Sequence, residues 1–147
     1  MSERPCFHLS IPAQDLEASV AWYVAVLGCR PGRRSAVAAI LDLAGHQLVL
    51  QHDRSSPCPQ AGIYPRHFGL IFPSLSAWQS LRQRIALQGV PWAVAPKCRY
   101  SGEPLEHHTL FVQDPSGNWL EFKHYSHPEA VLGCSELQEV GDRDLRG

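Results

Sequence analysis

The chain has 147 residues, of which 44% are hydrophobic and 18% charged, and its formal net charge is −1. This length and composition predict one domain with enough apolar residues for a buried core. The near-neutral charge, without a basic run, argues against binding to nucleic acid or a membrane surface, and no apolar run is long enough to span a bilayer. The five cysteines are scattered without a Cys-x-x-Cys pair, which disfavours a disulfide scaffold or zinc ribbon and favours a cytoplasmic location.

The first half of the chain predicts a strand, a helix and then two more strands. Residues 6–11 alternate between apolar and polar side chains, as a strand does. Asp15 fits the N-cap of a helix, and Gly28 fits its C-terminal glycine cap. Residues 36–43 and 46–51 then predict two strands joined by a tight turn.

The second half repeats this order. Residues 67–72 predict a strand, and Ser76 with Gln79 predicts a capping box for a helix that closes at Gly89. The later expected elements are a short strand near 92–94, an irregular stretch at 96–106, a strand at 108–113, an Asp-Pro-Ser-Gly turn at 114–117 and a strand at 118–125.

The repeated order is an internal duplication, because the stretch from His8 to Gly28 matches the stretch from His67 to Gly89 in layout. We therefore expect a single domain over residues 1–147 that is built from two modules. The expected parts are a first module at 5–52, a linker at 53–65, a second module at 66–125 and a C-terminal tail at 126–147.

The alternation of side chains along the strands predicts that two histidines and one carboxylate lie on the strand faces that do not pack on the helices. His8 and His67 lie on the strand face opposite the apolar residues expected to pack on the helices, and Glu121 has the same parity in the last strand. Two imidazoles and a carboxylate are a ligand set for Fe²⁺, Mn²⁺, Zn²⁺ or Ni²⁺. Three protein ligands leave open positions where a substrate could bind the ion. A solvent-facing Glu121 is the alternative.

Further polar residues are candidates for the same cavity. Gln47 and Gln51 share one strand face and are candidate substrate-binding residues. At most one of the adjacent residues 107 and 108 can face the cavity. His108 is a candidate proton shuttle, and an exposed loop histidine is the alternative. Tyr100 is a second catalytic candidate, and Arg99 a candidate for holding an anionic substrate group. Both lie in an expected loop, for which a solvated role is the alternative.

The sequence resembles the vicinal oxygen chelate superfamily, which includes glyoxalase I, extradiol dioxygenases and fosfomycin or bleomycin resistance proteins. The resemblance is carried by His8, the stretch from Asp15 to Gly28, the His-Phe-Gly-Leu run at 67–70 and the stretch from Phe111 to Phe122, and it covers roughly residues 6–125. It is closest to the single-domain predicted extradiol dioxygenase branch.

The resemblance implies an α+β fold of two βαβββ modules that form a curled mixed sheet around a metal-binding cavity. It also implies a homodimer, and a small substrate that chelates a divalent metal, with Fe²⁺ the first choice. The expected activity is dioxygenase-like, although Phe111 stands where ring-cleaving members have a tyrosine. The alternatives are a glyoxalase-type lyase or isomerase and a metal-free, resistance-type binding protein.

Overall fold

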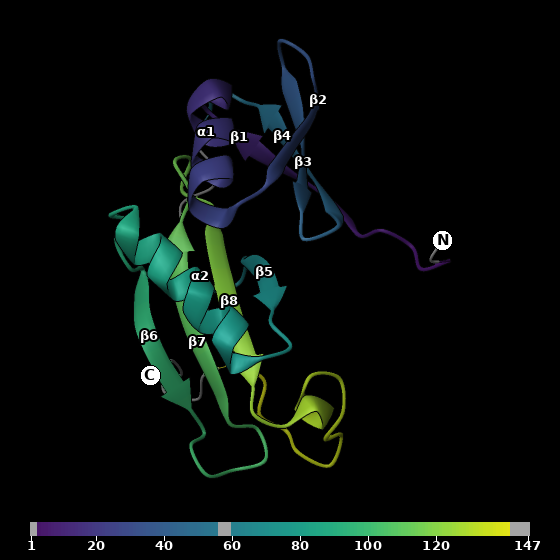
Figure 1. Cartoon of the computed structure of the whole chain (residues 1–147), viewed down its shortest axis with the longest axis vertical. Helices are drawn as coiled ribbons and strands as arrows, with labels where there is room; N and C mark the ends of the chain where they lie inside the picture. The colour runs from purple at the N-terminus through teal and green to yellow at the C-terminus, as the bar shows by residue number, and fades with distance from the viewer. Residues whose placement is uncertain (1–2, 56–59, 142–147) are drawn as a thin grey trace.

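The computed structural model describes residues 3–55 and 60–141, and it folds as two similar halves placed one above the other (Figure 1). The first half contains β1 (His8–Ala13), α1 (Leu16–Leu27), β2 (Arg30–Arg34), β3 (Ala38–Leu43) and β4 (His46–His52). The second contains β5 (Phe68–Ile71), α2 (Leu75–Leu87), β6 (Val94–Arg99), β7 (His107–Gln113) and β8 (Trp119–Tyr125).

Each half has a four-stranded mixed sheet with the same topology. The strand orders are β1-β4-β3-β2 and β5-β8-β7-β6. In each sheet the first strand runs parallel to its neighbour, and the remaining pairs are antiparallel. The predicted duplication and the predicted α+β fold of two βαβββ modules are therefore confirmed.

The helix boundaries follow from short-range capping. The side chain of Asp15 accepts a hydrogen bond from the backbone of Ala18, and Gly28 closes α1 in the left-handed conformation (φ 73°), as the sequence predicts. The second helix begins earlier than predicted, because Ser74 accepts the hydrogen bond from the backbone of Ala77. The predicted capping box of Ser76 and Gln79 is therefore wrong.

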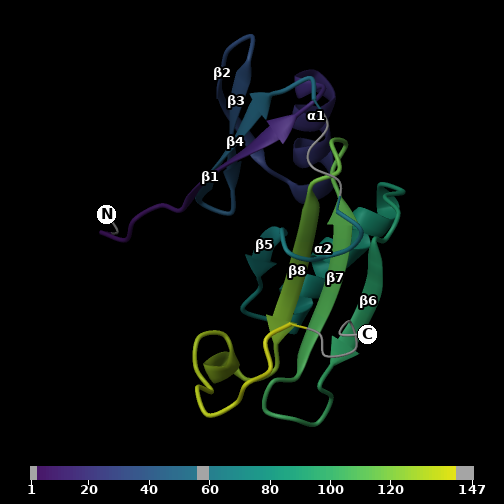
Figure 2. The same cartoon turned by 180° about the vertical axis from the view of Figure 1, so that it is seen from behind.

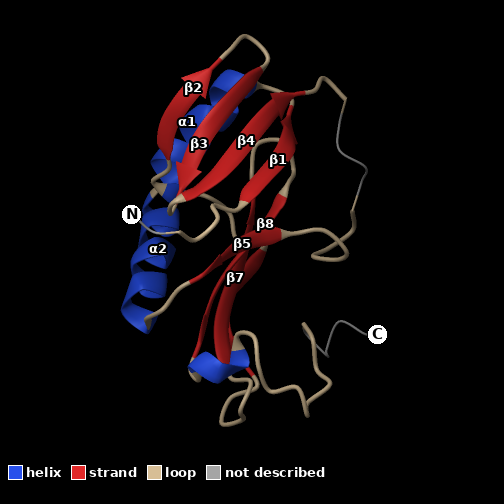
Figure 3. Cartoon of the chain, turned by 90° about the vertical axis from the view of Figure 1, so that its right-hand side faces the viewer, coloured by secondary structure: helices blue, strands red, loops and turns tan. Residues whose placement is uncertain are grey.

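Both helices lie on the same side of the two sheets (Figure 3). The strand faces turned toward them carry the buried apolar residues, with Tyr23 packed on the first sheet and Trp78 on the second. In both modules the apolar face of the sheet therefore packs against the helices. The opposite face of each sheet is left for polar side chains, which include the predicted ligands.

Two strands differ from the sequence prediction. The sequence gives no strand signal for β2, since all five of its residues, Arg-Pro-Gly-Arg-Arg, are exposed at a sheet edge. The stretch predicted to be irregular contains most of β6, which is a polar edge strand with a register shift against β7. Edge strands lack the apolar alternation on which the prediction relied.

The β7–β8 turn connects the two halves. The hydroxyl of Tyr23 in α1 donates to Asp114 Oδ2 at 2.7 Å. The backbone N–H of Gln14 donates to Ser116 Oγ at 2.9 Å, and Asn118 Nδ2 donates to the carbonyl of Pro12 at 3.0 Å. The Asp-Pro-Ser-Gly motif thus fixes the second module against the β1–α1 connection of the first.

The chain after β8 crosses the face of β7 and β8 that is turned away from α2 (Figure 2). It contains a short 3₁₀ turn at Pro128–Ala130 and no strand as far as residue 141. Parts of the predicted linker (56–59) and of the predicted tail (142–147) lie outside the described residues. Among the described helices, none has the length and apolar character needed to cross a membrane.

Candidate metal centre

Two of the three predicted metal ligands meet on the open face of the second sheet. His67 stands immediately before β5, and Glu121 lies in β8, the strand that pairs with β5. His67 Nε2 is 3.2 Å from Glu121 Oε1. The pairing of Phe68 with Leu120 places the two side chains next to each other across the sheet.

Neighbouring groups hold both side chains in place. His67 Nδ1 lies 2.6 Å from the carbonyl oxygen of Ile63, which can only accept, so Nδ1 carries a proton and donates it. The hydroxyl of Thr109 donates to Glu121 Oε2 at 2.6 Å. Lys123 Nζ lies 3.7 Å from Glu121 Oε1. Such outer contacts orient histidine and carboxylate ligands around a metal ion.

The electrostatics of this pair favour a cation between the two side chains. Burial raises the pKa of Glu121, but the hydrogen bonds from His67 and Thr109 and the charge of Lys123 together lower it to about 2. The hydrogen bond with Glu121 raises the pKa of His67. Since Nδ1 already donates to Ile63, Nε2 either carries a second proton or presents a lone pair to the carboxylate. A bound proton or a bound metal ion satisfies both groups.

His8 lies on the first sheet and is exposed. Its Nδ1 lies 2.7 Å from Gln47 Oε1, and the two residues are paired in the β1–β4 register. Because an amide oxygen can only accept, Nδ1 donates and Nε2 is left as the acceptor nitrogen. Gln47, predicted to bind substrate, therefore orients His8 in this structure.

His8 does not join His67 and Glu121 within one chain. Over residues 3–55 and 60–141 there is no group of three or more His, Cys, Asp or Glu side chains that could hold a metal ion. The chain instead carries two separated parts of the predicted ligand set, one on each sheet. Gln51 is exposed on β4, where it pairs with Ala38, and it lies four residues along the strand from Gln47.

Of the two adjacent histidines, His107 and not the predicted His108 lies on the face of Glu121. His107 pairs with Tyr125, whose parity is that of Glu121. His108 lies on the helix side, where its ring centroid is 5.3 Å from that of Trp78. His108 has the same strand parity as the apolar core residues Leu110 and Val112, and this is the signal in the sequence that could have identified His107.

Arg99 and Tyr100 both lie close to this face, although Arg99 belongs to β6 and not to the predicted loop. Arg99 is buried, and its guanidinium carbon lies 5.9 Å from the ring centroid of Phe111. The ring centroid of Tyr100 lies 6.0 Å from that of His107. The sequence predictions assign no role to Thr109, Lys123 or Tyr125, and all three share the Glu121 face.

The donor set is suited to a divalent transition metal. Imidazole nitrogens and carboxylate oxygens together bind iron, manganese, zinc and nickel. His67, Glu121 and the exposed Nε2 of His8 are of this kind, and the first two are already positioned by hydrogen bonds. Two candidate ligands in one chain would leave positions on a metal ion open for further ligands.

Comparison with known proteins identifies the fold and the family. A model of the Glyoxalase/Bleomycin resistance protein/Dioxygenase superfamily matches residues 6–122. A glyoxalase/bleomycin resistance protein/dioxygenase from Alicyclobacillus acidocaldarius is 36% identical with a TM-score of 0.81, and the match covers 86% of this chain and 96% of that one. The comparison with curated proteins gave no significant match.

Two further structures share the fold at low identity. A lactoylglutathione lyase from Agrobacterium tumefaciens is 19% identical with a TM-score of 0.62, covering 82% of this chain and 92% of that one. A fosfomycin resistance protein from Listeria monocytogenes is 17% identical with a TM-score of 0.65, covering 88% and 98%. The same fold thus occurs in a lyase and in a resistance protein. On the family model and the 36% identical structure, this chain belongs to the glyoxalase/bleomycin resistance protein/dioxygenase superfamily.

Proposed function

We propose that this chain is a metal-dependent enzyme that acts on a small oxygenated substrate, with a dioxygenase-like reaction and Fe²⁺ as the first choice of metal. The observation that carries the proposal is the pair formed by His67 Nε2 and Glu121 Oε1, 3.2 Å apart. Each side chain is fixed by its own hydrogen bond, from His67 to Ile63 and from Thr109 to Glu121. A pre-oriented pair of this kind is what a metal site needs.

The third ligand in this proposal is His8 of a second copy of the chain. The β1 sheet presents His8 to solvent with Nε2 as its acceptor, and the exposed side chains of Phe7 (62%) and Ile71 (43%) flank a cleft between the two sheets. In a two-fold dimer each surface contacts the same surface of the partner, so two equivalent sites would form. The homodimer is therefore part of the proposal.

The metal ion, when bound, would act as a Lewis acid toward two oxygens of the substrate. The protein groups have separate tasks. Thr109 keeps the Glu121 carboxylate in place, and Lys123 offers a positive charge beside it. Burial lowers the pKa of His107, and its Nδ1 donates to the carbonyl of Leu105, so Nε2 is the acceptor that can take a proton from a substrate hydroxyl.

The two alternative functions have less support. A glyoxalase-type isomerisation needs a base facing the metal, whereas Gln47 is an amide whose oxygen accepts the hydrogen bond of His8. A metal-free binding function does not explain why a histidine and a carboxylate are held together on the open face of the sheet. We therefore favour the metal-dependent enzyme.

Metal analysis tests the proposal directly. Protein purified anaerobically should bind one Fe²⁺ per chain. His67→Ala or Glu121→Ala should lower the affinity by more than about 100-fold, since losing a ligand costs more than losing one of its outer contacts, which costs about 10–100-fold. His8→Ala should weaken binding in the same way. His52→Ala serves as the control, because His52 is also an exposed histidine of the first sheet and has no role in the proposal.

The outcome that contradicts the proposal is full metal occupancy in a variant that lacks His8, His67 and Glu121 together. If the metal binds as proposed, oxygen consumption with a panel of catechols and related hydroxy acids examines the reaction class. Turnover of a hemithioacetal with Ni²⁺ or Zn²⁺, without oxygen uptake, would instead favour the lyase or isomerase.

A further inference from the structure

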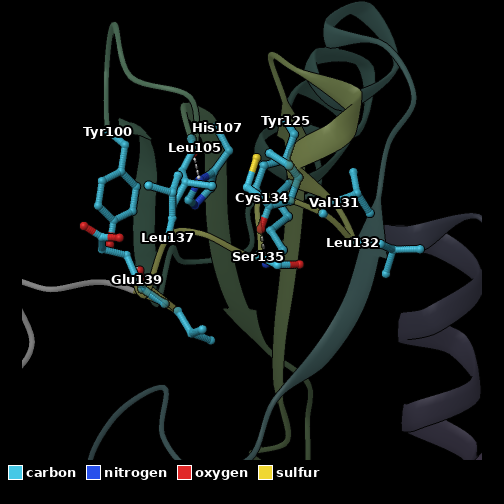
Figure 4. A pocket seen from close by; sticks show the side chains of 15 residues that line it. Tyr100, Leu105, His107, Tyr125, Val131, Leu132, Cys134, Ser135, Leu137 and Glu139 are labelled. Carbon is cyan, nitrogen blue, oxygen red and sulfur yellow. Dashed lines mark hydrogen bonds between the residues drawn. The ribbon is translucent and has the colours of Figure 1, made fainter.

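A cavity of about 390 Å³ lies between the second sheet and the C-terminal segment, which we define as residues 126–141. The walls come from β7 and β8 on one side and from the segment on the other (Figure 4). Lys123 lines the cavity, and its Nζ lies 3.7 Å from Glu121 Oε1. The cavity therefore begins beside the proposed metal centre.

The sheet side of the cavity is a row of three aromatic rings. The ring centroid of His107 lies 6.0 Å from that of Tyr100 and 4.9 Å from that of Tyr125. Figure 4 shows His107 and Tyr125 from the strands and Tyr100 from the turn after β6, together with Leu137 and Cys134 from the segment. Flat rings on one wall and aliphatic groups on the other suit a planar aromatic ligand.

Charge in the cavity is concentrated at its inner end. Lys123 Nζ lies 3.2 Å from the hydroxyl oxygen of Tyr125 and 5.2 Å from its ring centroid. Glu139 also borders the cavity, but it is exposed on the segment, and its Oε2 accepts a hydrogen bond from the backbone of Gln138. Lys123 is the positively charged residue that lines the cavity, so an anionic group of the ligand would bind on its cavity side, away from the Glu121 carboxylate.

The far end of the segment is bonded to one tyrosine and lies close to a second. The hydroxyl of Tyr100 donates to the carbonyl of Gly141 at 2.7 Å. Gly141 has a positive φ of 83°, and a Cβ added there would lie only 2.1 Å from the hydroxyl of Tyr64. The ring centroid of Tyr64 is in turn 6.1 Å from that of His67. The segment thus crosses the open face and ends near the proposed metal centre.

We propose that the C-terminal segment completes a binding pocket for a single-ring aromatic acid, with the ring against Tyr100, His107 and Tyr125 and the carboxylate at Lys123. The volume is near the lower end of the range of ligand cavities, about 300–1,000 Å³, which suits one ring. The segment lies outside the residues matched by the superfamily model, so the family alone does not provide this pocket. The inference rests on the proposed function only in taking this ligand to be the substrate.

Binding to the metal-free protein tests the pocket without any turnover. Benzoate should bind saturably in calorimetry, and cyclohexanecarboxylate, which has the same charge but no aromatic ring, should bind at least about 10-fold more weakly. Lys123→Gln should weaken benzoate binding by about 10-fold or more, and Lys123→Arg should retain most of it. No saturable benzoate binding, or equal binding of the two acids, would overturn the proposal.

A pair of glycine variants tests the role of the segment. Gly141→Ala should strain the left-handed backbone at this position and crowd the Tyr64 hydroxyl, and should therefore disturb the end of the segment and weaken benzoate binding severalfold. Gly89→Ala is the matched control, because Gly89 also has a positive φ (70°) but has nothing within 4 Å of an added Cβ. Tyr100→Phe removes only the hydroxyl that holds Gly141 and gives an independent measurement. Unchanged affinity in both Gly141→Ala and Tyr100→Phe would rule out the segment as a pocket wall.

The two proposals fail in different ways. Normal metal binding without benzoate binding would reject the aromatic pocket and leave the metal centre in place. Benzoate binding that depends on Lys123 and Gly141, in a protein that binds no metal, would reject the proposed enzyme and retain the pocket.

Discussion

The carboxylate of Asp114 is the most heavily bonded side chain of the β7–β8 turn. Its two oxygens accept hydrogen bonds from the backbone of Ser116 and Asn118, from Asn118 Nδ2 and from the hydroxyl of Tyr23. Tyr23 belongs to the other module and is fully buried. Burial, followed by the charge of Asp114, raises the pKa of Tyr23 well above its ordinary value, so the hydroxyl remains a donor throughout the physiological range.

Removing the Tyr23 hydroxyl should therefore weaken the contact between the modules. A buried hydrogen bond to a charged acceptor contributes about 1.5–3 kcal/mol, so Tyr23→Phe should lower the free energy of unfolding by about that amount. Urea denaturation followed by fluorescence measures it. Ser80→Ala, which removes an exposed hydroxyl on α2, should cost less than about 0.5 kcal/mol. Equal losses in the two variants would show that the bond does not hold the modules together.

A second prediction concerns the thiol of Cys29, which is buried just after α1. Burial raises its pKa to about 12, and the nearby charge of Asp42 adds to this. Because the thiolate is the reactive form, Cys29 should react with iodoacetamide at least about 10-fold more slowly than the exposed Cys6 at neutral pH. Mass spectrometry of timed samples measures both sites. Similar rates in the folded protein would contradict the buried position, whereas similar rates in denaturant are expected.

At the scale of the elements, strand β5 depends on a glycine. Gly69 pairs with Glu121, and a Cβ at this position would lie 1.6 Å from the carbonyl oxygen of Glu121. No rotamer change can relieve a clash with backbone, so an alanine must push β5 away from β8. Since His67 directly precedes β5, this movement also separates the two proposed ligands.

Gly69→Ala should therefore destabilise the fold by about 3 kcal/mol or more and weaken metal binding. Gly62→Ala provides the control, because Gly62 lies close to His67 in the chain and an added Cβ there meets nothing within 4 Å. Thermal unfolding of the metal-free protein and Fe²⁺ titration of the folded fraction give the two measurements. If Gly69→Ala and Gly62→Ala had the same free energy of unfolding and the same Fe²⁺ affinity, the close packing of Gly69 against β8 would not be required.

The elements also show what sequence alone can predict. Strands with one apolar face, such as β4 and β8, and the helix between Asp15 and Gly28 were predicted because burial and capping leave local patterns. The edge strands β2 and β6 were not, since exposed polar strands have no such pattern. In the site, parity placed Glu121 on the open face. The same argument applied to Leu110 and Val112 chooses His107 over His108, but the apolar Phe111 on the opposite face hides that pattern in the sequence.

At the scale of the whole molecule, the positions of His8 and of the His67–Glu121 pair could not be predicted from local patterns. Parity states which sheet face a residue occupies but not how two sheets are arranged. The hydrogen bonds of Asp114, Ser116 and Asn118 hold the modules in an arrangement where His8 lies apart from the pair. If the proposed third ligand is His8, a partner chain must supply it.

Mixed dimers test this arrangement. His8→Ala and Glu121→Ala should each abolish the high-affinity metal site when studied alone. If each site combines His8 of one protomer with His67 and Glu121 of the other, a heterodimer of the two variants contains one site with all three ligands and one site with neither His8 nor Glu121. Equal amounts of the variants, mixed and refolded to exchange protomers at random, should therefore recover roughly a quarter of the wild-type metal sites.

The control for this experiment is a mixture of His67→Ala and Glu121→Ala. Both substitutions fall in the same module, so every heterodimer site still lacks one of the two ligands, and no recovery is expected. Recovery in the first mixture but not in the second requires ligands from two chains, because a site formed within one chain stays broken in every protomer of either mixture. An absence of recovery in the first mixture, with heterodimers demonstrated by native mass spectrometry, would mean that His8 does not complete the site across the dimer.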